Sequence, residues 1–302
     1  MTQDLRVLEL FCGIGGAAAA LAGRAEVALA IDINRLALEV YTANFPHPVA
    51  ARTLESLSAA ELARTGADLW WLSPPCQPFT RRGLGRDDED PRSQGLLALA
   101  RHIPAVRPRF IALENVPGFA GSRSHARLSE ALAAGGYEVA ERLLCPSELG
   151  APSRRLRFYL VASREGLAEP RPPARTPITL RSCLEWPPEE GAPAELALDP
   201  ALAQRYRHAI DVVDADDPAA LTACFTSAYG RSPVRSGSYL ATSGGLRRFS
   251  PREVLNLLGF PAGYRLPAGL SLANGWRLAG NSLSVPAVLE VLRTLPGWEE
   301  VS

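Results

Sequence analysis

The sequence contains no lysine: all 32 of its basic residues are arginines, and 32 acidic residues balance them. A chain with a formal net charge of zero has no general attraction for phosphate backbones, so a nucleic-acid partner would need a local basic surface. Nothing follows from arginine in place of lysine at any single position, because a bias in genomic base composition produces the same pattern.

Cysteine is scarce as well. The five cysteines are odd in number, widely spaced, and form no Cys-x-x-Cys pair. This usage is typical of a reducing compartment and argues against a disulfide framework and against a zinc site. We therefore expect a cytoplasmic protein that binds no metal.

Long apolar runs are also missing. No run approaches the roughly 18 residues that cross a membrane, and the first residues lack the basic start and apolar centre of a signal peptide. We therefore expect no membrane association.

The length of 302 residues permits one large domain or two unequal ones, and a hydrophobic content of 47% is ample for a core. Strand and helix patterns alternate through the first half of the chain, which predicts an α/β fold. Residues 169–193 are rich in proline and mark a domain boundary. The following residues, up to 245, lack clear alternation of strands and helices.

The N-terminal stretch has the pattern of a nucleotide-binding unit. Residues 6–10 predict a strand, residues 11–16 (Phe-Cys-Gly-Ile-Gly-Gly) a tight turn, and an alanine-rich helix follows. A second predicted strand ends at Asp32, where a carboxylate can accept hydrogen bonds from a ribose diol. The pattern does not separate a nicotinamide cofactor from S-adenosylmethionine.

Cys76 lies in a stiff turn. Residues 68–72 predict a buried strand, and residues 73–80 (Ser-Pro-Pro-Cys-Gln-Pro-Phe-Thr) end it with prolines. The turn presents the sulfur at the carboxyl end of a strand, where open α/β sheets keep their sites. Stiffness suits a nucleophile, because a misplaced sulfur loses the advantage of proximity. A buried structural cysteine is the alternative, but it leaves the three prolines unexplained.

Charged residues follow at three further places. The predicted strand 110–113 ends in Glu114, and glutamate is rarely buried without a partner. In a parallel sheet Glu114 and Cys76 would face one cleft. Arg155 and Arg157 share one face of an extended segment. The alternative is that they are solvated arginines on an edge strand.

The charged segment 81–95, which directly follows the Cys76 turn, is either a solvated loop or a mobile lid.

In the second half, residues 204–208 and 224–231 mix aromatic side chains with arginine. Such interleaving suits RNA, whose bases stack on rings and guanidinium planes. An ordinary domain surface explains the same composition.

The order of these motifs resembles the cytosine-5 methyltransferase family of DNA and RNA over nearly the whole chain. The matching residues are 11–16, Asp32, 73–80, 114–116, Arg155 with Arg157, and 280–282 (Gly-Asn-Ser). Residues 31–34 and the tripeptide 224–226 (Cys-Phe-Thr) are similar to the tRNA-methylating branch, historically named as a DNA methyltransferase homologue. Ser153 departs from that pattern, since the branch usually carries Asn there, and this leaves the role of Ser153 open.

The resemblance implies a Rossmann-like S-adenosylmethionine-dependent catalytic domain over residues 1–168. It implies a smaller target-recognition domain over 169–271 and a C-terminal segment, 272–302, that returns to the catalytic domain. The implied reaction is methyl transfer from S-adenosylmethionine to an anticodon-loop cytosine of tRNA for aspartate, by a monomer, through a covalent Cys76 adduct. A restriction-type DNA cytosine-5 methyltransferase shares all the motifs and is the alternative. A nicotinamide-dependent oxidoreductase would leave residues 74–76 and 114–116 without a use.

The resemblance also assigns site residues. Cys76 attacks carbon 6 of the base, Glu114 hydrogen-bonds ring nitrogen 3, and Arg157 with Arg155 holds the base oxygen or a phosphate. The predicted cofactor-binding residues are Phe11, Ile14, Gly15, Gly16, Asp32, Leu54, Glu55, Ser73, Asn281 and Ser282. The predicted substrate-binding residues are Cys224, Phe225, Thr226 and Tyr229. The base that removes the ring proton is not identified, and Cys224 either acts chemically or shapes the pocket.

Overall fold

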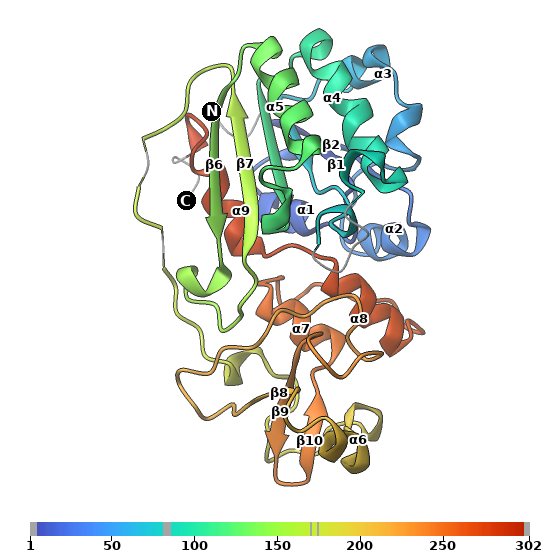
Figure 1. The fold of residues 1–302 in the computed structure, drawn as a ribbon, viewed down its shortest axis with the longest axis vertical. Helices are drawn as coiled ribbons and strands as arrows, with labels where there is room; N and C mark the ends of the chain where they lie inside the picture. Colours follow the sequence, from blue (N-terminus) through green and yellow to red (C-terminus); the bar gives the residue numbers. More distant parts are fainter. Residues whose placement is uncertain (1–4, 81–85, 170, 174, 299–302) are drawn as a thin grey trace. The chain divides into compact units, whose positions relative to one another are not determined.

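A computed structural model describes residues 5–80, 86–169, 171–173 and 175–298 (Figure 1). The chain folds into two compact units, which both draw on separate stretches of sequence. The first comprises Met1–Leu144, Leu156–Pro172 and Val288–Ser302; the second comprises Cys145–Arg155 and Pro173–Ala287. Within the described residues, no helix has both the length and the apolar character needed to cross a membrane.

The first unit is built on a seven-stranded sheet with the order β3-β2-β1-β4-β5-β7-β6. The strands are β1 (Arg6–Leu10), β2 (Glu26–Asp32), β3 (Val49–Ala51), β4 (Leu69–Leu72), β5 (Phe110–Asn115), β6 (Glu138–Leu144) and β7 (Arg157–Ser163). The first five run parallel, and β7 is antiparallel to both β5 and β6. This sheet confirms the predicted α/β class. Its strand order reverses between β1 and β4, which is where such sheets bind ligands.

Helices cover both faces of this sheet. They are α1 (Gly16–Leu21), α2 (Arg35–Thr42), α3 (Ala59–Arg64), α4 (Gln94–Val106) and α5 (Arg123–Gly135). Alternate residues of the strands, such as Leu8, Trp70 and Ile111, form one apolar core with side chains of α3, α4 and α5. Figure 1 shows α4 and α5 lying side by side over this face. On the other face, Tyr41 of α2 donates a hydrogen bond to Glu9 of β1.

The second unit holds a three-stranded sheet in the order β10-β9-β8. Its strands are β8 (Asp211–Val213), β9 (Ser238–Thr242) and β10 (Gly245–Arg248), and its helices are α6 (Pro200–Arg205), α7 (Pro251–Leu257) and α8 (Leu272–Gly280). The last helix, α9 (Val285–Leu292), leads out of this unit into the first. The irregular segments agree with the lack of alternation in this part of the sequence.

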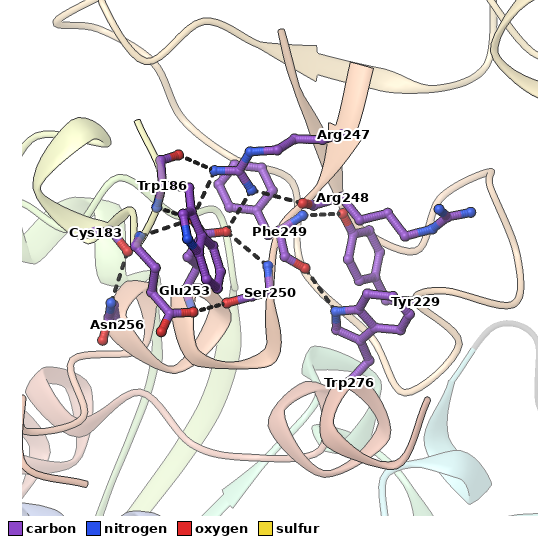
Figure 2. A network of polar contacts seen from close by, with 11 residues as sticks. Cys183, Trp186, Tyr229, Arg247, Arg248, Phe249, Ser250, Glu253, Asn256 and Trp276 are labelled. Atoms are coloured by element: carbon purple, nitrogen blue, oxygen red, sulfur yellow. Dashed lines mark hydrogen bonds and ion pairs between the residues drawn. The ribbon is translucent and has the colours of Figure 1, made fainter. Parts of the chain in front are cut away.

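A buried ion pair organises the second unit (Figure 2). The two terminal nitrogens of Arg247 each lie 2.8 Å from an oxygen of Glu253, whose side chain is fully buried. Arg247 also donates to the carbonyl of Trp186 at 2.6 Å, while Glu253 accepts the backbone N–H of Ser250 at 2.8 Å. A buried ion pair is tolerated only when extra hydrogen bonds satisfy its remaining donors and acceptors. This network therefore ties the proline-rich segment to β10 and α7.

Candidate active site

Cys76 follows the end of β4, beside the point where the strand order reverses. The backbone N–H of Ser73 donates to the carbonyl of Leu10 at the end of β1, at 3.2 Å. The indole N–H of Trp71 donates to the Ser73 hydroxyl at 2.7 Å. Cys76 then caps a short 3-10 turn, η3 (Gln77–Phe79), and its side chain is partly exposed. The thiol is thus held on a braced turn and remains reachable.

The exit of β5 is fastened to this turn. The side-chain amide of Asn115 donates to the carbonyl of Pro74 at 3.0 Å. Gly118 passes so close to η3 that a Cβ there would lie 2.2 Å from the carbonyl oxygen of Phe79. Asn115 was not among the predicted site residues, although its place next to Glu114 in the matched motif was the available signal. These contacts fix the Cys76 turn to the strand that carries Glu114.

Glu114 is paired with Arg157. The Nε atom of Arg157 lies 3.1 Å from a carboxylate oxygen of Glu114, and the two side chains are 14% and 10% exposed. Arg157 is the first residue of β7, which runs antiparallel to β5 and brings the guanidinium alongside. The pair places a carboxyl group and several N–H donors together at this edge of the sheet, which suits recognition of a polar ring.

Part of the charged segment that follows Cys76 is firmly anchored. Residues 81–85 lie outside the described residues, while the rest forms η4 (Asp87–Glu89), η5 (Pro91–Ser93) and the start of α4. The carboxylate of Asp87 accepts the backbone N–H groups of Arg123 and Ser124 at the start of α5. Hydrogen bonds therefore hold Asp87 to the start of α5, and a role of this segment as a lid stays a prediction.

Arg92 brings a positive charge to the region of Cys76. Its guanidinium donates to Asp90 at 2.9 and 2.7 Å. This hydrogen bonding is the main reason that the pKa of Arg92 lies above its ordinary value. The charge of a Cys76 thiolate raises the pKa further, by a smaller amount. Arg92 is a residue that the sequence reasoning missed, because only the fold shows that η5 packs against η3.

Several predicted cofactor-binding residues gather at the ends of β1 and β2. Both oxygens of Asp32 accept backbone N–H groups at 2.8 Å, from Gly13 and from Asn34. Burial raises the pKa of Asp32. Gly15 has a positive φ of 84°, and a Cβ there would lie 2.6 Å from the ring of Phe45. Only glycine fits this turn, which opens α1 next to the carboxylate.

An apolar pair lies close to that turn. A Cβ on Gly95 would meet the ring of Phe11 at 3.1 Å and the side chain of Leu54 at 3.6 Å, so these two predicted residues approach one another. Leu54 is buried in η2 (Leu54–Ser56), and Phe11 is partly exposed. Of the other predicted residues in this unit, Ile14 and Gly16 are buried, Ser73 is partly exposed, and Glu55 is exposed.

The remaining predicted residues belong to the second unit, including Arg155. Arg155 and Arg157 therefore do not act as one pair of neighbouring guanidinium groups, because their side chains contact different sets of residues. The side chains of Phe225 and Tyr229 are 4% and 1% exposed. The Tyr229 hydroxyl donates to a backbone carbonyl, that of Ser238, at 2.6 Å. Cys224 and Thr226 are partly exposed, Asn281 is exposed and Ser282 is buried.

The described residues contain no group of three or more His, Cys, Asp or Glu side chains arranged to hold a metal ion. The five cysteines, all within the described part of the chain, form no disulfide.

Comparison with known proteins relates the chain to cytosine-5 methyltransferases. The family model described as "C-5 cytosine-specific DNA methylase" matches residues 5–216. The tRNA (cytosine(38)-C(5))-methyltransferase of Mus musculus is 30% identical, over 97% of this chain and 94% of that protein. The Spodoptera frugiperda protein of the same name is 31% identical, over 96% and 98%. A solved structure of the S. pombe Dnmt2 methyltransferase superposes with a TM-score of 0.84 at 29% identity, covering 96% and 98% of the two chains.

Proposed function

Because the chain belongs to the C-5 cytosine methyltransferase family, we propose that it methylates carbon 5 of an anticodon-loop cytosine in tRNA. We take tRNA for aspartate as the substrate and S-adenosylmethionine as the methyl donor. The observation that carries the proposal is the similarity, over nearly the full length of both chains, to tRNA (cytosine(38)-C(5))-methyltransferases. The placing of Cys76 and Glu114 at neighbouring strand ends supports it.

Cys76 is the proposed nucleophile. Carbon 5 of cytosine is a poor nucleophile until a thiolate adds to carbon 6 and converts the ring to an enamine-like form. A free thiol is only a few per cent ionised at neutral pH. The braced turn and the nearby charge of Arg92 favour a thiolate held in place. After methyl transfer to carbon 5, a base removes the proton there, and the electron pair it leaves re-forms the ring double bond as the Cys76–carbon 6 bond breaks and the thiolate is released.

Glu114 and Arg157 are proposed to hold the ring while it reacts. A proton shared between Glu114 and ring nitrogen 3 would neutralise the negative charge that builds up as the thiolate adds. The Nε atom of Arg157 lies 3.1 Å from that carboxyl group, and we assign the Arg157 guanidinium to the neighbouring base oxygen. Fixed donors of this kind stabilise developing charge without reorganising during the reaction.

The residues of the first unit fit S-adenosylmethionine, which when bound supplies an electrophilic methyl group. Asp32 is held by two backbone N–H groups and has lone pairs left for a ribose diol. The glycine at position 15 lets the chain turn sharply against the rings of Phe45 and Tyr41 at the start of α1. Phe11 and Leu54 offer apolar surface for an adenine ring. We assign Ile14, Gly16, Glu55 and Ser73 to the same site, and we keep Asn281 and Ser282 of the second unit as predicted cofactor-binding residues.

The second unit is proposed to recognise the target, and it contains residues 173–271 of the expected target-recognition domain, 169–271. Its residues Cys224 and Thr226 are partly exposed, and we assign them to contacts with the target base. An unpaired cytosine in an RNA loop needs less unstacking than one in a duplex, so a small recognition unit suits a loop substrate. We place this reaction in the cytoplasm and assign it to a monomer without metal.

Transfer of labelled methyl groups tests the proposal. Purified enzyme should label total tRNA in preference to genomic DNA, and bisulfite sequencing should locate the modified cytosine in the anticodon loop. Cys76→Ala should abolish the signal. Preferential labelling of DNA would reject the tRNA assignment in favour of a DNA methyltransferase, as the name of the matching family model suggests.

A substrate analogue tests the covalent step separately. RNA carrying 5-fluorocytosine should trap the enzyme as a stable adduct, because fluorine does not leave as a proton does. Trapping of Cys76→Ala would show that another residue is the nucleophile.

A further inference from the structure

Arg155 is buried, with 4% of its surface exposed, and its guanidinium donates to four groups of the second unit. One terminal nitrogen donates to the carbonyl of Phe225 at 3.0 Å and to the sulfur of Cys224 at 3.4 Å. The other donates to the carbonyl of Gly280 at 3.1 Å and to the carbonyl of Ser282 at 2.5 Å. One side chain thus joins the 224–226 loop to the 280–282 turn.

The charge of Arg155 is not balanced by a carboxylate among the described residues. Its acceptors are three neutral carbonyls and a sulfur, and its Nε atom is buried without a hydrogen-bond partner in the described part of the chain. A buried cation held in this way is costly, and apolar replacements of buried charges are often more stable. Stability alone therefore does not account for an arginine here.

The two segments also touch directly. A Cβ on Gly280 would lie 2.4 Å from the backbone carbon of Thr226, so the loop and the turn are in backbone contact. Aromatic packing also holds the loop: the ring of Phe225 lies 4.8 Å from that of Tyr229, whose hydroxyl accepts the backbone N–H of Phe249 (Figure 2). The loop is thus held by the Arg155 guanidinium and by packed rings.

We propose that Arg155 is a positioning residue that locks the 224–226 loop and the 280–282 turn into one rigid element. The inference rests on the proposed function, in which the loop faces the target base and the turn faces the methyl donor. A rigid link between them fixes the reacting groups relative to one another, and a displacement of about 1 Å costs about 100-fold in rate. The planar fork of arginine makes this link, whereas lysine, as a point charge, does not.

Kinetics on the full-length enzyme test the proposal. Arg155→Met and Arg155→Lys should lower the single-turnover rate of methyl transfer about 100-fold. Dissociation constants for tRNA and for S-adenosylmethionine should stay within about threefold of wild type. Arg154 is the matched control, because it is exposed and, within the described residues, its side chain donates only to the carbonyl of Leu221, which belongs to neither the loop nor the turn. Arg154→Lys should keep the wild-type rate.

A second variant covers the case in which Arg155 variants fold poorly. Gly280→Ala retains the guanidinium but pushes the 224–226 loop away, so it should show the same loss of rate with unchanged affinities. Losses of affinity that match the loss of rate in both variants would overturn the positioning role. A wild-type rate in both would overturn it as well.

Hydrogen exchange tests the link that Arg155 makes between the loop and the turn, independently of the proposed reaction. In Arg155→Met, amide exchange should rise together in residues 224–226 and 280–282, while residues 200–205 of α6 keep wild-type protection. If amide exchange rises in neither segment, or in only one of them, the link through Arg155 is rejected, whatever substrate the enzyme methylates. A wild-type enzyme that modifies DNA instead of tRNA would reject the proposed substrate and leave this exchange result standing.

Discussion

Arg92 affects the ionisation of the Cys76 thiol. The pKa of Arg92 is raised first by Asp90 and in smaller part by the charge of Cys76, and the interaction is mutual, so the guanidinium favours the Cys76 thiolate. We expect Arg92→Gln to slow alkylation of Cys76 by iodoacetamide at neutral pH and to move its pH profile upward. Mass spectrometry of the peptide that contains Cys76 measures this directly.

Arg101→Gln is the control for that experiment, since Arg101 is exposed further along α4. Arg92→Lys should restore part of the alkylation rate because it restores the charge. An unchanged profile in Arg92→Gln would mean that Arg92 does not act on the thiol.

Glu9 gives the protein a pH-dependent stability. Burial raises the pKa of Glu9 from its ordinary value of 4.5 to about 8. Between these values the folded state keeps a proton that the unfolded chain releases, so stability falls as pH rises, by up to about 1.4 kcal/mol per pH unit. Glu9→Gln has no such proton. Its free energy of unfolding should therefore rise relative to wild type between about pH 5 and about pH 8, as urea unfolding would measure.

Glu130→Gln serves as the comparison, because Glu130 is exposed on α5 and should show no such trend. A constant difference between Glu9→Gln and wild type across this range would show that Glu9 is ionised in the folded protein.

At the scale of elements, the contact between η3 and the turn after β5 places the nucleophile. Gly118→Ala would set a methyl group 2.2 Å from the carbonyl oxygen of Phe79, so one of the two turns must move. Overpacking of this kind costs about 1–3 kcal/mol. We expect the free energy of unfolding to fall by that amount and methyl transfer to fall at least about tenfold, since the Cys76 turn is displaced.

Gly263→Ala is a suitable control, because a Cβ there meets nothing within 4 Å. Wild-type methyl transfer in Gly118→Ala would show that the position of η3 does not depend on this contact.

At the scale of the whole molecule, a chain of zero net charge must bind RNA through local patches. In the second unit a groove of about 340 Å³ is lined by apolar side chains with Gln204 and Arg207, and the Arg205 guanidinium lies 5.3 Å from the ring of Tyr206. The double variant Arg205→Glu with Arg207→Glu should weaken tRNA binding. If each arginine contacts one phosphate, the salt slope should fall by about 1.4.

The matched variant reverses two charges in the first unit, Arg64→Glu with Arg101→Glu, which are exposed on α3 and α4. Filter binding at several salt concentrations compares the two. Equal losses would assign the effect to total charge and not to the proposed recognition surface.

The sequence by itself determined the α/β class and the places of the strands that carry Cys76 and Glu114. It did so because local signals settle these features: buried apolar runs form strands, and prolines and glycines end them. The glycine turn before α1 was equally local, since Gly15 has a positive φ of 84°, which favours glycine. The family resemblance rested on the same local motifs.

Tertiary structure alone decided which of these residues meet. Asn115 reaches Pro74, Arg157 pairs with Glu114, and Arg92 approaches Cys76 only because strands and turns distant in sequence become neighbours. Arg155 and Arg157 look equivalent in the sequence, yet the chain passes from one compact unit to the other between them. Arg155 is enclosed by carbonyls, while Arg157 faces a carboxylate. The spacing of residues along the chain does not encode this difference, because side-chain partners depend on long-range packing.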